Sequence, residues 1–224
     1  MHPAPVDSPP SPRHPRPARA TAVLAALSAL LLIAVAVRWN PLMTLDVELA
    51  RTAHRWAVDD PGLTRVNRVL TDWFWDPWTM RALCAVVVIW LVRRHNAWRL
   101  AMWVAATCAV GTLIQQGLKA AVGRDRPVWT DPVDSAHYAA FPSGHAMTAT
   151  VVCGLILWLL HRYGAGRVLW RTACALAAVS VVGVGLTRLW LGVHWPSDVL
   201  GGWLLGALTV TVSVTAYERL TASN

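Results

Sequence analysis

The chain has 224 residues, of which 55% are hydrophobic and only 14% are charged, and its formal net charge is +8. A soluble domain usually has about a quarter of its residues charged, so the composition argues against a soluble fold. The basic residues are spread over the segments between apolar stretches and form no nucleic-acid-binding motif, so we expect no nucleic-acid partner. Basic cytoplasmic connectors of a membrane protein explain the sign of the charge.

Residues 1–19 are rich in proline and arginine and poor in apolar residues, which predicts a disordered tail. Its arginines precede the first apolar stretch and should keep the tail in the cytoplasm. A cleaved signal peptide is the alternative, because "AVA" at 34–36 resembles a cleavage site. The apolar run is longer than the usual signal core of about 7–15 residues, which favours an uncleaved span.

Six apolar stretches approach the roughly 17–25 residues that a membrane-crossing helix needs. They lie at about 20–37, 77–92, 100–118, 146–161, 169–187 and 199–216. Too little polar sequence remains to cover six such helices in a soluble protein. We therefore expect an all-α, integral membrane bundle of six transmembrane helices over 20–216, followed by a short C-terminal tail at 217–224.

The connector at 38–76 has an amphipathic pattern. Leu45, Leu49, Ala53 and Trp56 recur at helical spacing, which predicts a helix that lies along the membrane interface. Three tryptophans near its end suit the aromatic belt of a membrane protein. We expect its charged residues to form a solvated face and not a site.

The connectors predict the orientation of the bundle. Those at 93–99 and 161–171 are short and basic, with no acidic residue, and should be cytoplasmic. The connectors at 119–145 and 188–198 must then lie on the outer side. With six crossings, both termini are expected in the cytoplasm.

Two cations follow the third span, although the outer side is where positive charge is disfavoured. Lys119, the one lysine of the chain, and Arg126 are seven residues apart, about two helical turns, and share a face if the helix continues. Binding of lipid headgroups is one interpretation of this pair.

The fourth span begins with "FPSGH". Ser143 is a good N-cap and Gly144 permits close approach of the backbone. The free amides of the new helix make an anion site, which the helix dipole strengthens. A simple capped span is the alternative, but it does not explain His145 at an apolar boundary.

The stretch "TRLWLGVHWPSD" joins the fifth and sixth spans. Arg188 has a planar, charged fork that suits phosphate oxygens. His194 and Asp198 are one helical turn apart, so the carboxylate can fix the ring tautomer and leave the other nitrogen free to attack. A purely structural His–Asp pair is the alternative.

Taken together, these residues indicate phosphoryl transfer. The cations and amides can stabilise a phosphoryl group through its transition state, while one histidine attacks and the other manages protons. Acidic residues are too scattered to hold a metal ion. We therefore expect a reaction that uses neither a metal ion nor a cofactor.

The Lys119–Arg126 pair, "FPSGH" and "TRLWLGVHWPSD" form three motifs. In their order and spacing these motifs resemble the signature of the type 2 phosphatidic acid phosphatase family, whose site is shared with vanadium haloperoxidases. The family's third motif usually begins with Ser, where this chain has Thr187, which keeps the hydroxyl. The resemblance implies that His194 is the nucleophile, that Asp198 orients it and that His145 is the general acid. It further implies a phosphate held by Lys119, Arg126, Arg188, the Ser143 hydroxyl and the amides of Ser143 and Gly144.

We therefore expect a membrane phosphatase that hydrolyses lipid phosphate monoesters or isoprenyl and lipid pyrophosphates through a phosphohistidine. Its site should lie on the extracytoplasmic face, with membrane lipids around it. A phosphotransferase that uses an alcohol in place of water would need the same residues. A transporter or lipid-binding protein fits less well, because transporters place polar residues near the bilayer midplane.

Overall fold

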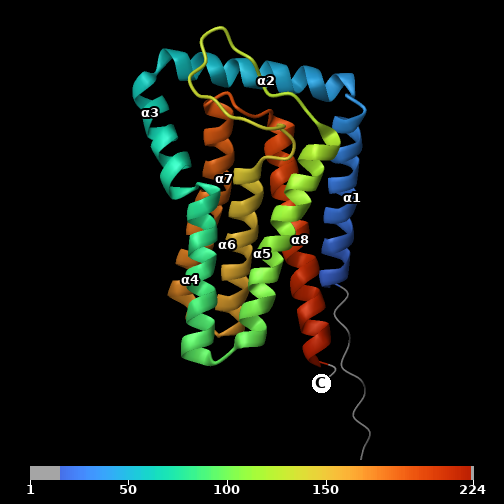
Figure 1. The fold of residues 1–224 in the computed structure, drawn as a ribbon, viewed down its shortest axis with the longest axis vertical. Coiled ribbons are helices and arrows are strands. Elements are labelled where there is room, and N and C mark those ends of the chain that lie inside the picture. Colours follow the sequence, from blue (N-terminus) through green and yellow to red (C-terminus); the bar gives the residue numbers. More distant parts are fainter. Residues whose placement is uncertain (1–15, 223–224) are drawn as a thin grey trace, which may run out of the picture.

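The computed structural model describes residues 16–222, and all the regular secondary structure in that range is helical. Eight α-helices and one π-helical turn occur there. They are α1 (Arg16–Ala36), α2 (Asn40–Asp59), α3 (Pro61–Val69), the π-helical turn η1 (Leu70–Phe74), α4 (Pro77–His95), α5 (Trp98–Val122), α6 (Gly144–Arg162), α7 (Arg167–Trp190) and α8 (Pro196–Ala222). Figure 1 shows long helices side by side, with α2 lying across one end of the bundle.

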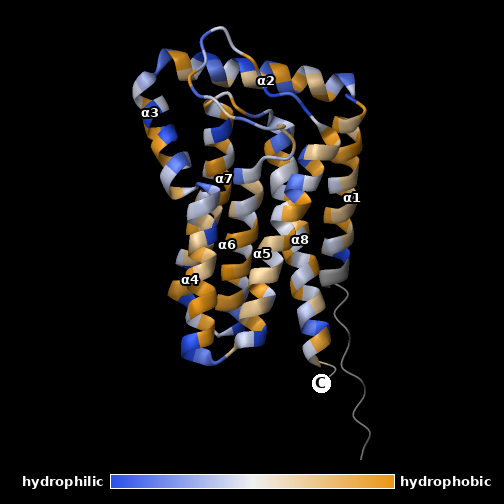
Figure 2. Cartoon of the chain, in the orientation of Figure 1, coloured by the Kyte–Doolittle hydropathy of each residue, from blue (hydrophilic) through white to orange (hydrophobic). Residues whose placement is uncertain are grey.

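Six helical segments within the described residues are long and apolar enough to cross a membrane. They are 19–36, 61–95, 98–122, 144–162, 167–190 and 196–222. Figure 2 shows apolar residues along the sides of the bundle, while hydrophilic residues gather on α2, α3 and the tips of the helices. The expected all-α membrane bundle of six transmembrane helices is therefore confirmed.

The ends of the spans differ from the sequence prediction. Residues 1–15 of the expected disordered tail lie outside the described residues, but 16–19 already belong to α1. The expected C-terminal tail from 217 continues α8 as far as Ala222. The helix persists because the side chains near its end are held: Trp158 Nε1 donates to Glu218 Oε1 at 3.3 Å, and the ring of Tyr217 packs edge-on against Trp158.

The 38–76 connector is two helices and not one. Asp60 ends α2 and caps α3, where its side chain accepts a hydrogen bond from the Leu63 amide at 2.9 Å, and Pro61 fits the first helical position. The chain then turns down the side of the bundle and joins α4 through η1 (Figure 1). Consequently the second apolar segment begins near 61 instead of 77.

The face that α2 packs on the bundle is not its most apolar stripe. Leu45, Leu49 and Trp56 are about half exposed, at 49%, 48% and 59%. The buried residues of α2 are Asp46, Ala50, His54 and Ala57. The expectation that the charged residues of the connector are all solvated is therefore wrong for Asp46, which is 1% exposed.

Helix α6 is the most buried helix, and the contact between its start and α8 positions the site. A Cβ on Gly202 of α8 would lie 2.7 Å from the Ser143 carbonyl oxygen and 3.0 Å from the Met147 amide nitrogen. Only glycine allows the two backbones to come so close. The Ser143 amide donates to the Asp198 carbonyl at 2.9 Å, which ties the beginnings of α6 and α8 together.

Candidate active site

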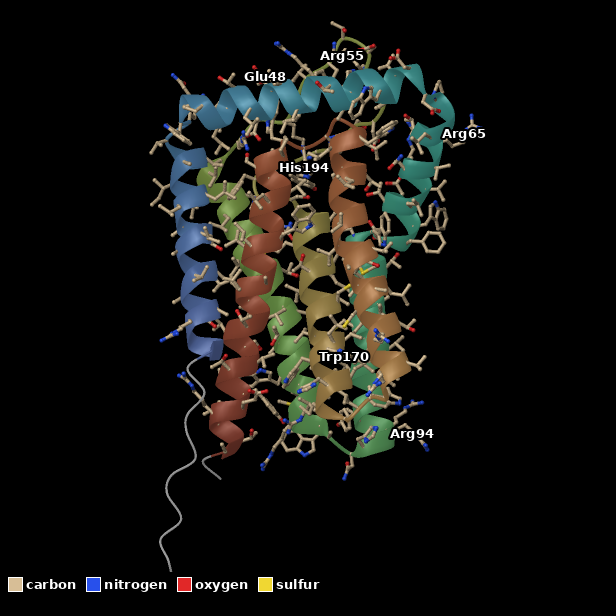
Figure 3. The ribbon with its side chains drawn as sticks, turned by 180° about the vertical axis from the view of Figure 1, so that it is seen from behind. Glu48, Arg55, Arg65, Arg94, Trp170 and His194 are labelled. Atoms are coloured by element: carbon tan, nitrogen blue, oxygen red, sulfur yellow. The ribbon has the colours of Figure 1, made fainter. Side chains whose placement is uncertain are left out.

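The structure brings the predicted site residues to one end of the bundle, beneath α2. Figure 3 shows His194 there, inside the bundle, while Glu48 and Arg55 point outward from α2. The other predicted residues come from five places in the fold. They are Lys119 near the end of α5, Arg126 in the loop that follows, Ser143, Gly144 and His145 at the start of α6, Arg188 at the end of α7, and Asp198 in the first turn of α8.

The charged groups lie close enough together to interact electrostatically. The positive charges that act on the His194 ring come from Arg126, Arg188 and Lys119. The same three cations, together with His194, act on the ring of His145. Three cations and two imidazoles therefore surround a single region of the bundle end.

His194 is 2% exposed and has a partner on each ring nitrogen. Its Nδ1 lies 3.3 Å from Asp198 Oδ2, and its Nε2 lies 3.1 Å from Arg126 Nη1. A guanidinium can only donate hydrogen bonds, so Nε2 must be the acceptor and Nδ1 carries the proton. Burial lowers the pKa of the His194 imidazole well below its usual value, and the neighbouring cations lower it further. The ring is therefore neutral, with its lone pair on the side of the cations.

Two of the cations bind carbonyl oxygens of the loop between α5 and α6. Arg126 Nε donates to the Tyr138 carbonyl at 2.9 Å and Nη2 donates to the His137 carbonyl at 3.3 Å. Its Nη1 donates instead to the Val193 carbonyl, in the connector between α7 and α8. Lys119 Nζ donates to the Ala139 carbonyl. A phosphate oxygen could replace these neutral carbonyl acceptors, because a hydrogen bond from a cation to an anion is stronger than one from a cation to a neutral oxygen.

Two buried polar atoms in the cluster have no partner. They are Ser143 Oγ, on a residue that is 0% exposed, and Arg188 Nε, on a residue that is 4% exposed. Arg188 Nη1 does donate to Thr71 Oγ1 at 3.3 Å. A buried group without a hydrogen bond is costly, and such groups gather where a ligand binds.

The start of α6 differs in one respect from the expectation. The resemblance implied that the amides of Ser143 and Gly144 hold the phosphate, but the Ser143 amide already donates to the Asp198 carbonyl. The Ser143 hydroxyl makes no capping hydrogen bond and stays available. The first amides of α6, from Gly144 onward, have no partner within the helix, as in any helix.

Two residues close to the His194–Asp198 pair escaped the sequence prediction. Arg124 Nη1 lies 2.7 Å from Asp198 Oδ1, and Arg124 Nη2 lies 2.6 Å from Asp46 Oδ2. The sequence carries one signal for Arg124, since "RDRP" places it two residues before Arg126. Asp46 has no comparable signal, because one acidic residue in an amphipathic helix is usually solvated.

Comparison with known proteins decides the family. The profile of the PAP2 superfamily matches residues 100–222, a range that contains every predicted site residue. The chain belongs to the PAP2 superfamily.

Individual PAP2 relatives are similar over most of the chain. Phosphatidylglycerophosphatase B of Bacillus subtilis is 26% identical over 182 residues, which cover 80% of this chain and 86% of that protein. Decaprenylphosphoryl-5-phosphoribose phosphatase of Mycobacterium tuberculosis is 34% identical over 155 residues, which cover 67% of this chain and 78% of that protein. The expected resemblance is confirmed, and the chain is a multi-pass membrane phosphatase of the PAP2 type.

The fold has also been seen in a PAP2 crystal structure. The transmembrane PAP2-type phosphatidylglycerolphosphate phosphatase from Bacillus subtilis superposes with a TM-score of 0.79 at 24% sequence identity, covering 89% of this chain and 96% of that one. This similarity supports the arrangement of the helices described above.

Proposed function

We propose that the chain hydrolyses phosphate monoesters or pyrophosphates of lipids through a phosphohistidine on His194. The observation that carries this proposal is the environment of the His194 ring. Asp198 lies beside Nδ1, and Nε2 faces Arg126 within the cation cluster. A neutral ring with a fixed tautomer and an outward lone pair is what a nucleophile needs.

Binding of substrate exchanges hydrogen bonds in this site. Phosphate oxygens take the donors of Arg126 and Lys119 from the loop carbonyls, and they also supply acceptors for Ser143 Oγ and Arg188 Nε. The His194 lone pair is released when Arg126 turns to the phosphate. The fixed cations then stabilise the charge that is spread over the equatorial oxygens in the transition state.

The chemistry takes two steps. His194 Nε2 forms a bond to phosphorus while the bond to the lipid oxygen breaks, and His145 gives that oxygen its proton. His145 then takes a proton from water, whose oxygen attacks the phosphohistidine and releases inorganic phosphate and free His194. One water molecule is consumed, and both histidines return to their starting states.

The site needs no metal ion for this reaction. Lys119, Arg126 and Arg188 already supply the positive charge that a divalent cation would bring. Among the residues that the structure describes, the carboxylate in contact with His194 is that of Asp198, and it is engaged by Arg124, His194 and the Trp195 amide. Three fixed cations also repel a further cation.

The site faces the extracytoplasmic side in this proposal. The basic 93–99 and 161–171 connectors, the start of α1 and the end of α8 lie at the end of the bundle away from α2 (Figure 1), and Arg94 marks this end in Figure 3. The positive-inside rule assigns that end to the cytoplasm. A lipid can then keep its chain in the bilayer and lift its headgroup to the site.

The test is phosphate release by the purified protein from a panel of lipid phosphates and lipid pyrophosphates in detergent, with EDTA present. Release from at least one lipid class, absent in His194→Ala, is the expected result. A wild-type protein that is inert towards the whole panel contradicts the proposal, and activity that needs Mg²⁺ contradicts its metal-free mechanism. Lipid alcohols added to the assay distinguish a phosphotransferase, which would form new phosphate esters at the expense of free phosphate.

A further inference from the structure

We propose that Arg124 and Asp46 are positioning residues for the catalytic pair, and that α2 is thereby part of the active site. The inference rests on the proposed function, because it concerns how Asp198 orients His194. The geometry points to it directly: one guanidinium joins a carboxylate of α2 to the carboxylate beside the nucleophile. Arg124 Nη2 binds Asp46 Oδ2 at 2.6 Å, and Arg124 Nη1 binds Asp198 Oδ1 at 2.7 Å.

The two oxygens of Asp198 have separate partners. Oδ1 accepts from Arg124, whereas Oδ2 accepts from the Trp195 amide at 2.9 Å and faces His194 Nδ1 at 3.3 Å. Holding Oδ1 fixes the plane of the carboxylate, and the plane decides where Oδ2 points. Arg124 therefore acts on the His194 ring through Asp198 and does not touch it.

Asp46 is fully engaged in this arrangement. Its Oδ1 accepts from the Ser197 amide at 2.9 Å, and its Oδ2 accepts from Ser197 Oγ at 2.5 Å as well as from Arg124. Ser197 Oγ in turn accepts from Arg124 Nη1 at 2.6 Å. Asp46 thus holds both Arg124 and the residue next to Asp198 in the chain.

Burial argues that this network serves position more than stability. The side chains of Asp46 and Asp198 are 2% and 0% exposed, and that of Arg124 is 11% exposed. Removing charges from water costs about as much as their attraction returns, so a buried ion pair adds little net stability. Its directional hydrogen bonds do fix geometry, and a displacement of about 1 Å at a reacting group can cost about 100-fold in rate.

Arg124 differs from the phosphate-binding cations in its partners. Its two terminal nitrogens contact Asp46, Asp198, Ser197 and the Met43 sulfur, and its guanidinium lies 5.6 Å from the centre of the Trp195 ring. No loop carbonyl is among these contacts, in contrast to Arg126. We therefore expect its loss to change the rate of the chemical step and not the binding of substrate.

The first test compares Arg124→Met and Asp46→Asn with two matched controls. Arg65→Met and Glu48→Gln remove exposed charges of the same kinds from α3 and α2, and both residues point outward in Figure 3. In detergent, on the best lipid phosphate of the panel, kcat should fall about 100-fold in Arg124→Met while KM stays within about twofold. Asp46→Asn, which keeps its shape and packing, should show a smaller loss of the same kind, and the controls should match wild type.

A double-mutant cycle separates positioning from general disruption. In an Asp198→Asn background, Arg124→Met and Asp46→Asn should each lower the single-turnover rate by less than about threefold relative to Asp198→Asn alone. The reason is that the group that they position is already altered. Multiplicative losses in that background, a loss confined to KM, or full activity in both single variants overturns the inference. If Arg124→Met does not fold, Asp46→Asn alone completes the cycle.

The proposed function and this inference fail in different ways. An inactive wild-type protein rejects the function. An active wild-type protein whose rate losses multiply in the cycle rejects only the positioning role.

Discussion

At the scale of single residues, the two histidines have different surroundings, which fits the different roles proposed for them. His194 is held from both sides by Asp198 and Arg126, which suits a nucleophile that must keep one tautomer. His145 lies in the first turn of α6 and is only partly buried. Partial exposure suits the proposed acid, which must release and regain a proton.

The first prediction follows from the acid role proposed for His145. An alkoxide that leaves a phosphate monoester needs a proton badly, whereas the phosphate that leaves a pyrophosphate is a far weaker base. His145→Ala should therefore slow monoester cleavage by about 10²–10⁴-fold and slow pyrophosphate cleavage at least about tenfold less. Single-turnover rates on matched lipids with the same chain measure this difference, and equal losses on both substrates would show that His145 is not the acid.

The second prediction concerns Ser143, whose buried hydroxyl has no partner. Ser143→Ala removes no hydrogen bond of the described structure, so the melting temperature in detergent should not fall. A hydrogen bond to a charged phosphate contributes about 1.5–3 kcal/mol, so inhibition by orthovanadate should weaken roughly tenfold or more. A variant that loses thermal stability but binds vanadate as well as wild type would assign the hydroxyl a structural role.

At the scale of elements, the close approach of α6 and α8 sets the distance between the start of α6, where the proposal places the phosphate, and the His194–Asp198 pair. Ser143 begins the first helix and Asp198 lies in the first turn of the second, and the Ser143 amide joins them. Gly202 makes this approach possible because a Cβ there would meet backbone atoms of α6.

The third prediction tests this helix contact. Gly202→Ala should destabilise the protein by about 1–3 kcal/mol, because backbone atoms cannot move aside as a flexible side chain can, and it should lower kcat by separating Asp198 from Ser143. Gly117→Ala on α5 is the control, since a Cβ there meets nothing within 4 Å. It should leave activity intact and match or raise the melting temperature, given the better helix propensity of alanine. Equal effects of the two changes would contradict this role of Gly202 in the contact between α6 and α8.

The sequence predicts helices better than it predicts which face of a helix is packed. The spacing of Leu45, Leu49 and Trp56 correctly indicates a helix, but these residues stay exposed while the neighbouring face is buried. At a membrane surface an apolar stripe can contact lipid and need not contact protein, so hydropathy does not identify the packed face. For this reason the sequence does not predict that Asp46 is buried against Arg124 and Ser197.

At the scale of the whole molecule, the path of the chain gathers the site. The parity of six crossings brings the ends of α5 and α7 and the starts of α6 and α8 to one end, and this could be predicted from the spans and connectors alone. The loop that places carbonyls of His137, Tyr138 and Ala139 on Arg126 and Lys119 could not, because its residues follow no periodic pattern. Its path depends on contacts between residues far apart in the sequence.

The fourth prediction concerns the orientation of the bundle. In a cysteine-free background, Val128→Cys lies in the α5–α6 loop at a position that is 91% exposed. It should react with a membrane-impermeant maleimide in intact cells, since that loop is placed outside. Gly166→Cys, in the exposed connector between α6 and α7, should react only after lysis. The reverse pattern would place the site on the cytoplasmic side.

The phosphohistidine mechanism is tested most directly by trapping the phosphorylated protein. In His145→Ala, the second step lacks its base, so a pyrophosphate lipid labelled with ³²P on its terminal phosphate should leave label on the protein. We predict a label that is stable to base, labile to acid, formed in the presence of EDTA, and absent when His194 is also replaced by alanine. Label that persists without His194, or a protein that turns over labelled lipid and never carries the label, would contradict the phosphohistidine mechanism.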